Sequence, residues 1–263
     1  MFILRPRRIE ACLIALLASC ASTEMRLAPR PDAEPVNQLD ISGNACGPAA
    51  LLASSRCGSV AWQTAAGSLP GSDDREKLRY WIRRHGLRPS TTLKGRMRWT
   101  SGGINVEDLT AAANEMNQPL YLPPLGHDDL FRRDGEGGAA QLNRARSRLE
   151  RSLAKGIPPL LSLRRFALRD GTWIPIQGHF VTVTGVPRGI PRGENSFAIR
   201  YLDPLGGKAC EGVIRIPGSS LLARPGQGSP CLEAVVPASG FGKKTVRRGD
   251  ESAVVAAAVI GRW

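Results

Sequence analysis

Apolar and polar positions divide the chain into a helical first part and a strand-rich second part. Helical periodicity, capping residues and Gly or Pro stops predict four helices, at residues 47–55, 72–86, 105–118 and 139–156. The first is apolar nearly all round, as is typical of a buried helix, and Pro48 is compatible with its first turn. Ser72 and Asn105 are expected to cap the second and third helices.

Strand signals dominate the chain after residue 157. Short stretches that are rich in β-formers and separated by Gly and Pro turns predict strands at 158–166, 179–186, 197–204, 212–217 and 232–237. The stretch at 252–261 fits either a further strand or a short helix. Because helices come first and strands later, the order predicts an α+β domain rather than a parallel α/β one.

The first 20 residues follow the pattern of a secretory signal. Arginines precede a short apolar stretch at 11–18, which is too short to cross a bilayer as a helix. The letters LASC, which end at Cys20, resemble the bacterial lipobox. This resemblance implies cleavage before Cys20 and a lipid on its sulfur, and Ala21 after it favours the outer membrane. A plain secretory signal, with Cys20 incidental, is the alternative.

These features predict a signal peptide at 1–19, a tether at 20–37 and one domain at 38–263. The tether is Pro-rich and has no periodicity, and no comparable linker follows it. The protein is therefore expected in a bacterial cell envelope, held by lipid on the periplasmic face of a membrane. Its net charge is +13, but the arginines are scattered and no nucleic-acid motif accompanies them, so no nucleic-acid partner is expected.

Four cysteines remain after Cys12 leaves with the signal and Cys20 receives lipid. In an oxidising compartment Cys210 and Cys231 flank a strand and are candidates for a disulfide, and Cys57 is an alternative partner for either. Sequence does not fix this connectivity. Cys46 lies one helix length from Cys57, about 16 Å, which is too far for a disulfide.

Cys46 stands at the start of the first predicted helix, directly before Gly47-Pro48. Unpaired N–H groups and the helix dipole favour a negative charge there, so the thiol is more readily ionised to the nucleophilic thiolate. Gly47 is expected to leave room for a substrate to approach the sulfur. Cys46 is therefore the candidate nucleophile.

His179 is the best candidate base for such a nucleophile. His85 lies at a helix C-terminus and His127 in an acidic loop, and both are expected to cap or to lie on the surface. His179 opens an alternating strand, which would aim its imidazole at a site; a half-buried histidine bonded to backbone is the alternative.

Two further residues complete the candidate site. Asp203 ends the next strand, so two adjacent antiparallel strands would place it beside His179, although an Asp-Pro pair also starts turns. Gln38 precedes Cys46, and its amide would donate to an oxyanion together with the Cys46 N–H. A polar residue at a linker end is the alternative for Gln38.

Taken in order, Gln38, NACGPAALL, GHFVTVTGV and YLDPLGG resemble the papain-like cysteine peptidases of the bacteriocin-processing kind over residues 36–206. The resemblance implies a papain-like fold, in which a helix bearing the cysteine packs on an antiparallel sheet. It also implies Cys46 as nucleophile, His179 as general base and acid, and Asp203 as the residue that orients His179. Gln38 would be the oxyanion donor.

The sequence thus predicts an envelope-anchored thiol hydrolase that cleaves an amide bond of a peptide or protein substrate through an acyl-enzyme. The alternative is a non-catalytic lipoprotein binding module with the same shell. No cofactor and no metal are expected, because there is no His-rich helix and no paired CxxC spacing.

Overall fold

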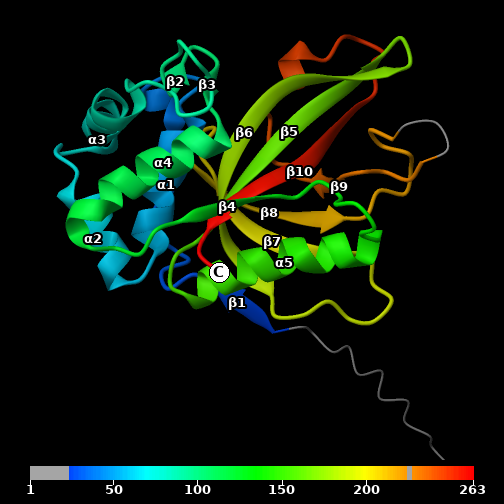
Figure 1. Cartoon of the computed structure of the whole chain (residues 1–263), viewed down its shortest axis with the longest axis horizontal. Helices are drawn as coiled ribbons and strands as arrows, with labels where there is room; N and C mark the ends of the chain where they lie inside the picture. Colours follow the sequence, from blue (N-terminus) through cyan, green and yellow to red (C-terminus); the bar gives the residue numbers. More distant parts are fainter. Residues whose placement is uncertain (1–23, 224–226) are drawn as a thin grey trace, which may run out of the picture.

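The strands form an antiparallel sheet that closes into a barrel (Figure 1). In this computed structural model the described residues are 24–223 and 227–263. The predicted signal peptide and the lipidation site Cys20 lie outside the described residues. Around the barrel the strands run β6 (Thr172–Pro187), β5 (Leu160–Arg169), β10 (Ser252–Gly261), β9 (Leu232–Val235), β8 (Lys208–Arg215) and β7 (Ser196–Asp203), which pairs again with β6.

Two short strands extend this sheet. β4 (Gly126–Asp129) pairs with β10, and β1 (Met25–Leu27) pairs with β6. Residues 24–37, which the sequence assigned to a tether, therefore belong to the folded domain. Ala28 is 4% exposed and its N–H donates to the Thr184 carbonyl at 2.8 Å. The apolar positions of this Pro-rich segment are too few for a recognisable pattern, but they suffice to add one short strand to the sheet.

Four helices and a hairpin gather on one side of the barrel (Figure 1). They are α1 (Cys46–Cys57), α2 (Val60–Ser68), α3 (Asp74–Trp81) and α4 (Val106–Asn117), with the hairpin of β2 (Trp99–Thr100) and β3 (Gly103–Ile104). The remaining helix, α5 (Gly138–Ala154), packs on β6, β10 and β1. Short helical turns are η1 (Gln38–Asp40), η2 (Ile82–Gly86), η3 (Gln118–Leu120) and η4 (Lys243–Thr245).

Helix α1 packs directly on the sheet. Eleven of its 12 residues are buried, all except Arg56, as its all-round apolar sequence predicted. The Thr182 hydroxyl of β6 donates to the Ala50 carbonyl at 2.7 Å. This contact fixes the helix against the strand that carries His179, and it determines where the N-terminus of α1 lies.

The prediction of a mixed helix and sheet domain with an antiparallel sheet is confirmed. Capping residues and stretches of β-formers in the sequence located most of the helices and strands. Asn105 caps α4, accepting from the Asp108 N–H at 2.7 Å. The cap of α3 is Asp73 rather than Ser72; Ser72 instead donates its N–H to Glu76 at 2.8 Å. The ambiguous stretch at 252–261 is a strand, β10, and helix α2 was not predicted.

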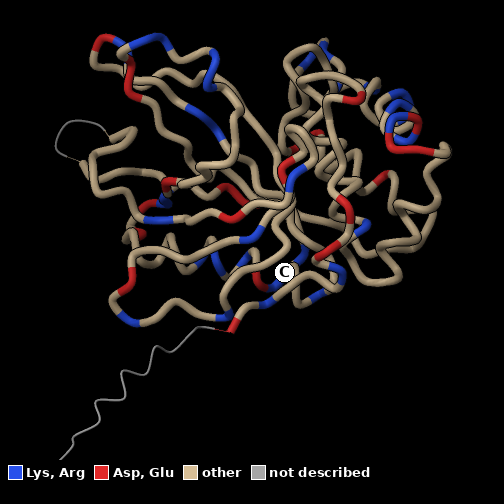
Figure 2. Tube along the Cα trace, turned by 180° about the vertical axis from the view of Figure 1, so that it is seen from behind, with Lys and Arg blue, Asp and Glu red and all other residues tan. Residues whose placement is uncertain are grey.

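Lysines and arginines are distributed over both halves of the molecule, as the scattered sequence positions predicted (Figure 2). Many of them are paired with acids, for example Arg144 with Glu136 at 2.8 Å. Among the described residues, no helix combines the length and the apolar character needed to cross a membrane.

Candidate functional site

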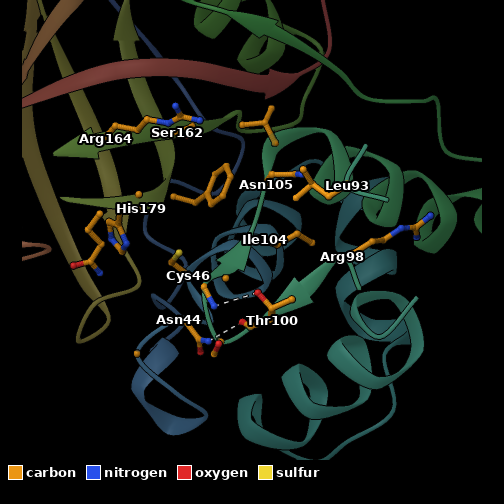
Figure 3. A pocket seen from close by; sticks show the side chains of 18 of the residues that line it. Asn44, Cys46, Leu93, Arg98, Thr100, Ile104, Asn105, Ser162, Arg164 and His179 are labelled. Atoms are coloured by element: carbon orange, nitrogen blue, oxygen red, sulfur yellow. Dashed lines mark hydrogen bonds between the residues drawn. The ribbon is translucent and has the colours of Figure 1, made fainter. Parts of the chain in front are cut away.

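A cavity of about 580 Å³ lies between the helical side of the molecule and the sheet (Figure 3). Cys46 and His179 both line it, one from the first position of α1 and one from β6. The hairpin β2–β3 supplies the opposite wall. The structure thus brings to one cavity two residues that are far apart in the sequence. Cys46 is 8% exposed and forms no disulfide.

Asp203 holds the His179 ring from the next strand. β6 and β7 pair with Thr182 opposite Leu202, so Asp203 falls near His179 at the end of the barrel. The His179 Nε2 lies 2.7 Å from the Asp203 Oδ1, and both side chains are almost completely buried. Asp203 also accepts the Leu205 N–H at 2.8 Å, which fixes the carboxylate. Because Nε2 faces Asp203, Nδ1 is the nitrogen available toward the cavity.

The charge state of His179 follows from these neighbours. Burial lowers its pKa, but the hydrogen bond to Asp203 and the neighbouring Cys46 outweigh burial and raise the pKa to about 9. Burial raises the pKa of Asp203, yet the hydrogen bond and charge of His179 outweigh burial and keep the pKa of that carboxyl below its ordinary value. His179 is therefore an imidazolium at neutral pH, next to a carboxylate.

Phe241 covers the His179 ring, a contact that sequence reasoning missed. The two rings stack with centroids 4.9 Å apart and planes 22° apart. Arg165 fixes this position: its Nε donates to the Phe241 carbonyl at 2.7 Å, and its guanidinium carbon lies 5.2 Å from the ring centroid. The aromatic face shields the His179–Asp203 pair from water. No local motif around Phe241 pointed to this role, because the contact spans the loop after β9.

Gln38 does not take the position expected for an oxyanion donor. It is buried in η1, its Nε2 donates to the Gly43 carbonyl at 2.6 Å, and it is not among the residues that line the cavity. Asn44 lines the cavity instead, with its Nδ2 donating to the Thr100 carbonyl at 2.9 Å (Figure 3). Both amides thus stabilise the turn that leads into Cys46. The residues between Gln38 and Cys46 form this turn, and the Gly43 carbonyl in it accepts the Gln38 donor.

Gly47 has a different role from the one expected. It does not line the cavity, and a Cβ at this position would lie 2.5 Å from the Ile104 Cγ2 and 3.3 Å from a Leu109 methyl. The glycine therefore allows β3 and α4 to pack against the start of α1 rather than leaving room for substrate. This close approach places the hairpin wall next to Cys46.

The other histidines and cysteines lie outside the cavity. His85 is buried rather than on the surface, 3.8 Å from Glu115, and burial lowers its pKa. His127 is exposed on β4, as expected. The cysteines at 57, 210 and 231 are free, so none of the candidate disulfides forms among the described residues. Burial raises the pKa of Cys57 to about 11.

In the part of the chain that the structure covers, no cluster of His, Cys, Asp or Glu has the arrangement of a metal site. Comparisons of the chain with protein-family models, with curated proteins and with solved structures found no match. The cavity brings together a sulfur at a helix N-terminus and an imidazole held by a carboxylate.

Proposed function

We propose that the protein is a thiol hydrolase that cleaves an amide bond of a peptide or protein, with Cys46 as nucleophile, His179 as base and acid, and Asp203 as the orienting carboxylate. The papain-like resemblance of the sequence and the packing of α1 on an antiparallel sheet support this proposal. The observation that carries it is the His179 imidazole, held by Asp203 at 2.7 Å and raised in pKa by both Asp203 and Cys46.

The proposed reaction has two halves. In the first, the Cys46 thiolate attacks the carbonyl carbon, the C–N bond breaks, and His179 gives its Nδ1 proton to the leaving amine. In the second, His179 takes a proton from water, the resulting hydroxide attacks the thioester, and the C–S bond breaks to restore the thiolate. The oxyanion of each tetrahedral intermediate would be stabilised by N–H groups in the first turn of α1.

The test is turnover of a peptide library by the reduced full-length protein, followed by mass spectrometry of the products. Cleavage of a subset of peptides at internal amide bonds is expected. An acyl-enzyme on Cys46, trapped by acid quench, would identify the nucleophile directly. If no peptide is cleaved and Cys46 carries no acyl group, the hydrolase proposal is wrong.

A non-catalytic binding module is the second candidate. It is favoured by the position of Gln38, because the amide that the family resemblance implies as oxyanion donor is bonded to Gly43. Loss of an oxyanion donor typically costs 10²- to 10³-fold in rate. Such a module would bind peptides in the cavity without forming an acyl-enzyme.

We also propose that the protein is exported to the bacterial envelope and anchored there by lipid on Cys20. The signal-like N-terminus and the lipobox-like sequence support this proposal. Cells fed a labelled fatty acid should label the wild-type protein but not Cys20→Ala. Equal labelling of both proteins, or export of an unlabelled wild type, would contradict the anchor.

A further inference from the structure

The walls of the cavity carry positive charge. Three arginines line it, Arg96, Arg98 and Arg164, and no aspartate or glutamate is found among its lining residues in the described ranges. Arg98 is neutralised by Glu115, with the two side chains 2.9 Å apart, and it is only 7% exposed. Figure 3 shows Arg98 directed away from Cys46. The charge available to a bound molecule therefore comes from Arg96 and Arg164.

Arg164 lies on the sheet wall, close in register to His179. It is opposite Gly178, the residue before His179, while Leu163 is opposite His179 itself. Its side chain is exposed, and Figure 3 shows it on the strand next to the one that carries His179. Arg169, further along β5, forms an ion pair with Asp250, but Arg164 does not take part in it. Within residues 24–223 and 227–263, Arg164 has no acidic side chain at ion-pair distance.

Arg96 faces the cavity from the helical side. It belongs to the loop before the hairpin, where its N–H donates to the Leu93 carbonyl at 3.1 Å and its carbonyl accepts from Ser90 at 2.7 Å. These two bonds fix its backbone while its side chain is exposed. No ion pair to Arg96 forms in the part of the chain described. The two arginines thus line one cavity from different sides, Arg96 from the loop before the hairpin and Arg164 from β5.

The nearest acidic residues line a neighbouring cavity rather than the main one. A smaller adjoining cavity of about 90 Å³ shares Arg164 and Ser162 with the main one, and Glu107 and Asp129 line it. Neither carboxylate reaches ion-pair distance of Arg164. A carboxylate bound in the main cavity would therefore meet guanidinium groups without competing acids, in a concave site that concentrates the positive potential.

We propose that the cavity selects acidic substrates: peptides that carry Asp or Glu side chains next to the attacked amide, paired with Arg96 and Arg164. This inference rests on the proposed function, because the same cavity would hold the reacting amide at Cys46. A partly exposed ion pair contributes about 1 kcal/mol, which corresponds to about fivefold in affinity. Two such pairs would favour an acidic over a neutral peptide by about tenfold or more, and the preference would decrease with salt.

The test uses a peptide that the library identifies as cleaved, resynthesised with Glu, Gln or Lys at each position flanking the amide. At low salt the kcat/KM ratio of Glu to Gln peptides should reach about fivefold for Glu at one position and about tenfold or more for Glu at two positions, with Lys peptides slowest. Arg164→Gln and Arg96→Gln should each reduce this ratio, whereas Arg151→Gln, on the exposed face of α5, should leave it unchanged. A ratio near one, or a ratio unaffected by both cavity variants, would overturn the proposal.

A binding experiment separates this proposal from the proposed function. The Cys46→Ala variant is titrated into a labelled alanine-based peptide carrying Glu and into its Gln counterpart, and anisotropy is measured at low and high salt. Tighter binding of the Glu peptide that depends on Arg164 would support acidic selection even if no peptide were cleaved. Equal cleavage of Glu and Gln peptides would contradict acidic selection while leaving the hydrolase proposal intact.

Discussion

Replacing Cys46 with alanine is expected to lower kcat/KM for a cleaved peptide at least about 10³-fold while the protein remains folded. The thiolate is the only group of the protein that bonds to the substrate carbon in the proposed reaction. The sulfur lies at the cavity surface, so its removal leaves no closed void. Activity is measured on the library-derived peptide, and folding by circular dichroism and thermal unfolding.

Cys57→Ala is the matched control for this variant. Cys57 ends the same helix, is fully buried and does not line the cavity. Its replacement should lower stability by about 1 kcal/mol, because a small buried side chain is truncated, but should preserve turnover. A Cys46→Ala protein as active as the parent would exclude the mechanism, whatever the control shows.

The second large effect is expected at Asp203. Asp203→Ala removes both the hydrogen bond and the charge that hold His179, and it should lower kcat/KM about 10²-fold. Asp203→Asn keeps a similar shape and a hydrogen-bonding side chain but removes the charge, so its loss of activity should be smaller. The difference between the two variants measures how much of the effect is orientation and how much is charge.

The pH dependence of kcat/KM in the Asp203 variants distinguishes an effect of Asp203 on His179 from a purely structural role. Asp203 raises the pKa of His179, which reaches about 9 in the intact site. Without the carboxylate charge this pKa falls, so His179 loses its proton at a lower pH and the alkaline limb of kcat/KM moves to lower pH. A purely structural role for Asp203 would reduce activity or stability without moving this limb.

Features of the fold that depend on neighbouring residues could be predicted from the sequence. The Asn105 cap, the buried α1 and the strands carrying His179 and Asp203 each follow from a few neighbouring residues. The pairing of His179 with Asp203 was predictable because the two strands are consecutive in the chain and antiparallel. The stretch at 252–261 was ambiguous because its strand is buried along most of its length and shows little alternation.

Contacts between distant segments could not be predicted. Phe241 stacks on His179 through a loop whose path depends on the closed barrel. Gln38 has the residue type of an oxyanion donor, but its hydrogen bond to Gly43 depends on how the turn before Cys46 folds. The charge of the cavity depends on which arginines are neutralised: Arg98 is buried against Glu115, whereas Arg164 is exposed.

The proposed hydrolysis depends on a Cys46 thiolate stabilised by protonated His179, and the pH dependence of Cys46 alkylation tests this most directly. The reduced protein is treated with iodoacetamide between pH 5 and 9, and labelling at Cys46 is followed by mass spectrometry, with buried Cys57 and Cys231 as internal references. We predict that the rate at Cys46 depends less steeply on pH in the wild type than in His179→Gln, where it falls about tenfold per pH unit below neutral pH. A wild-type rate that follows the ordinary thiol profile, unchanged by His179→Gln, would contradict the account.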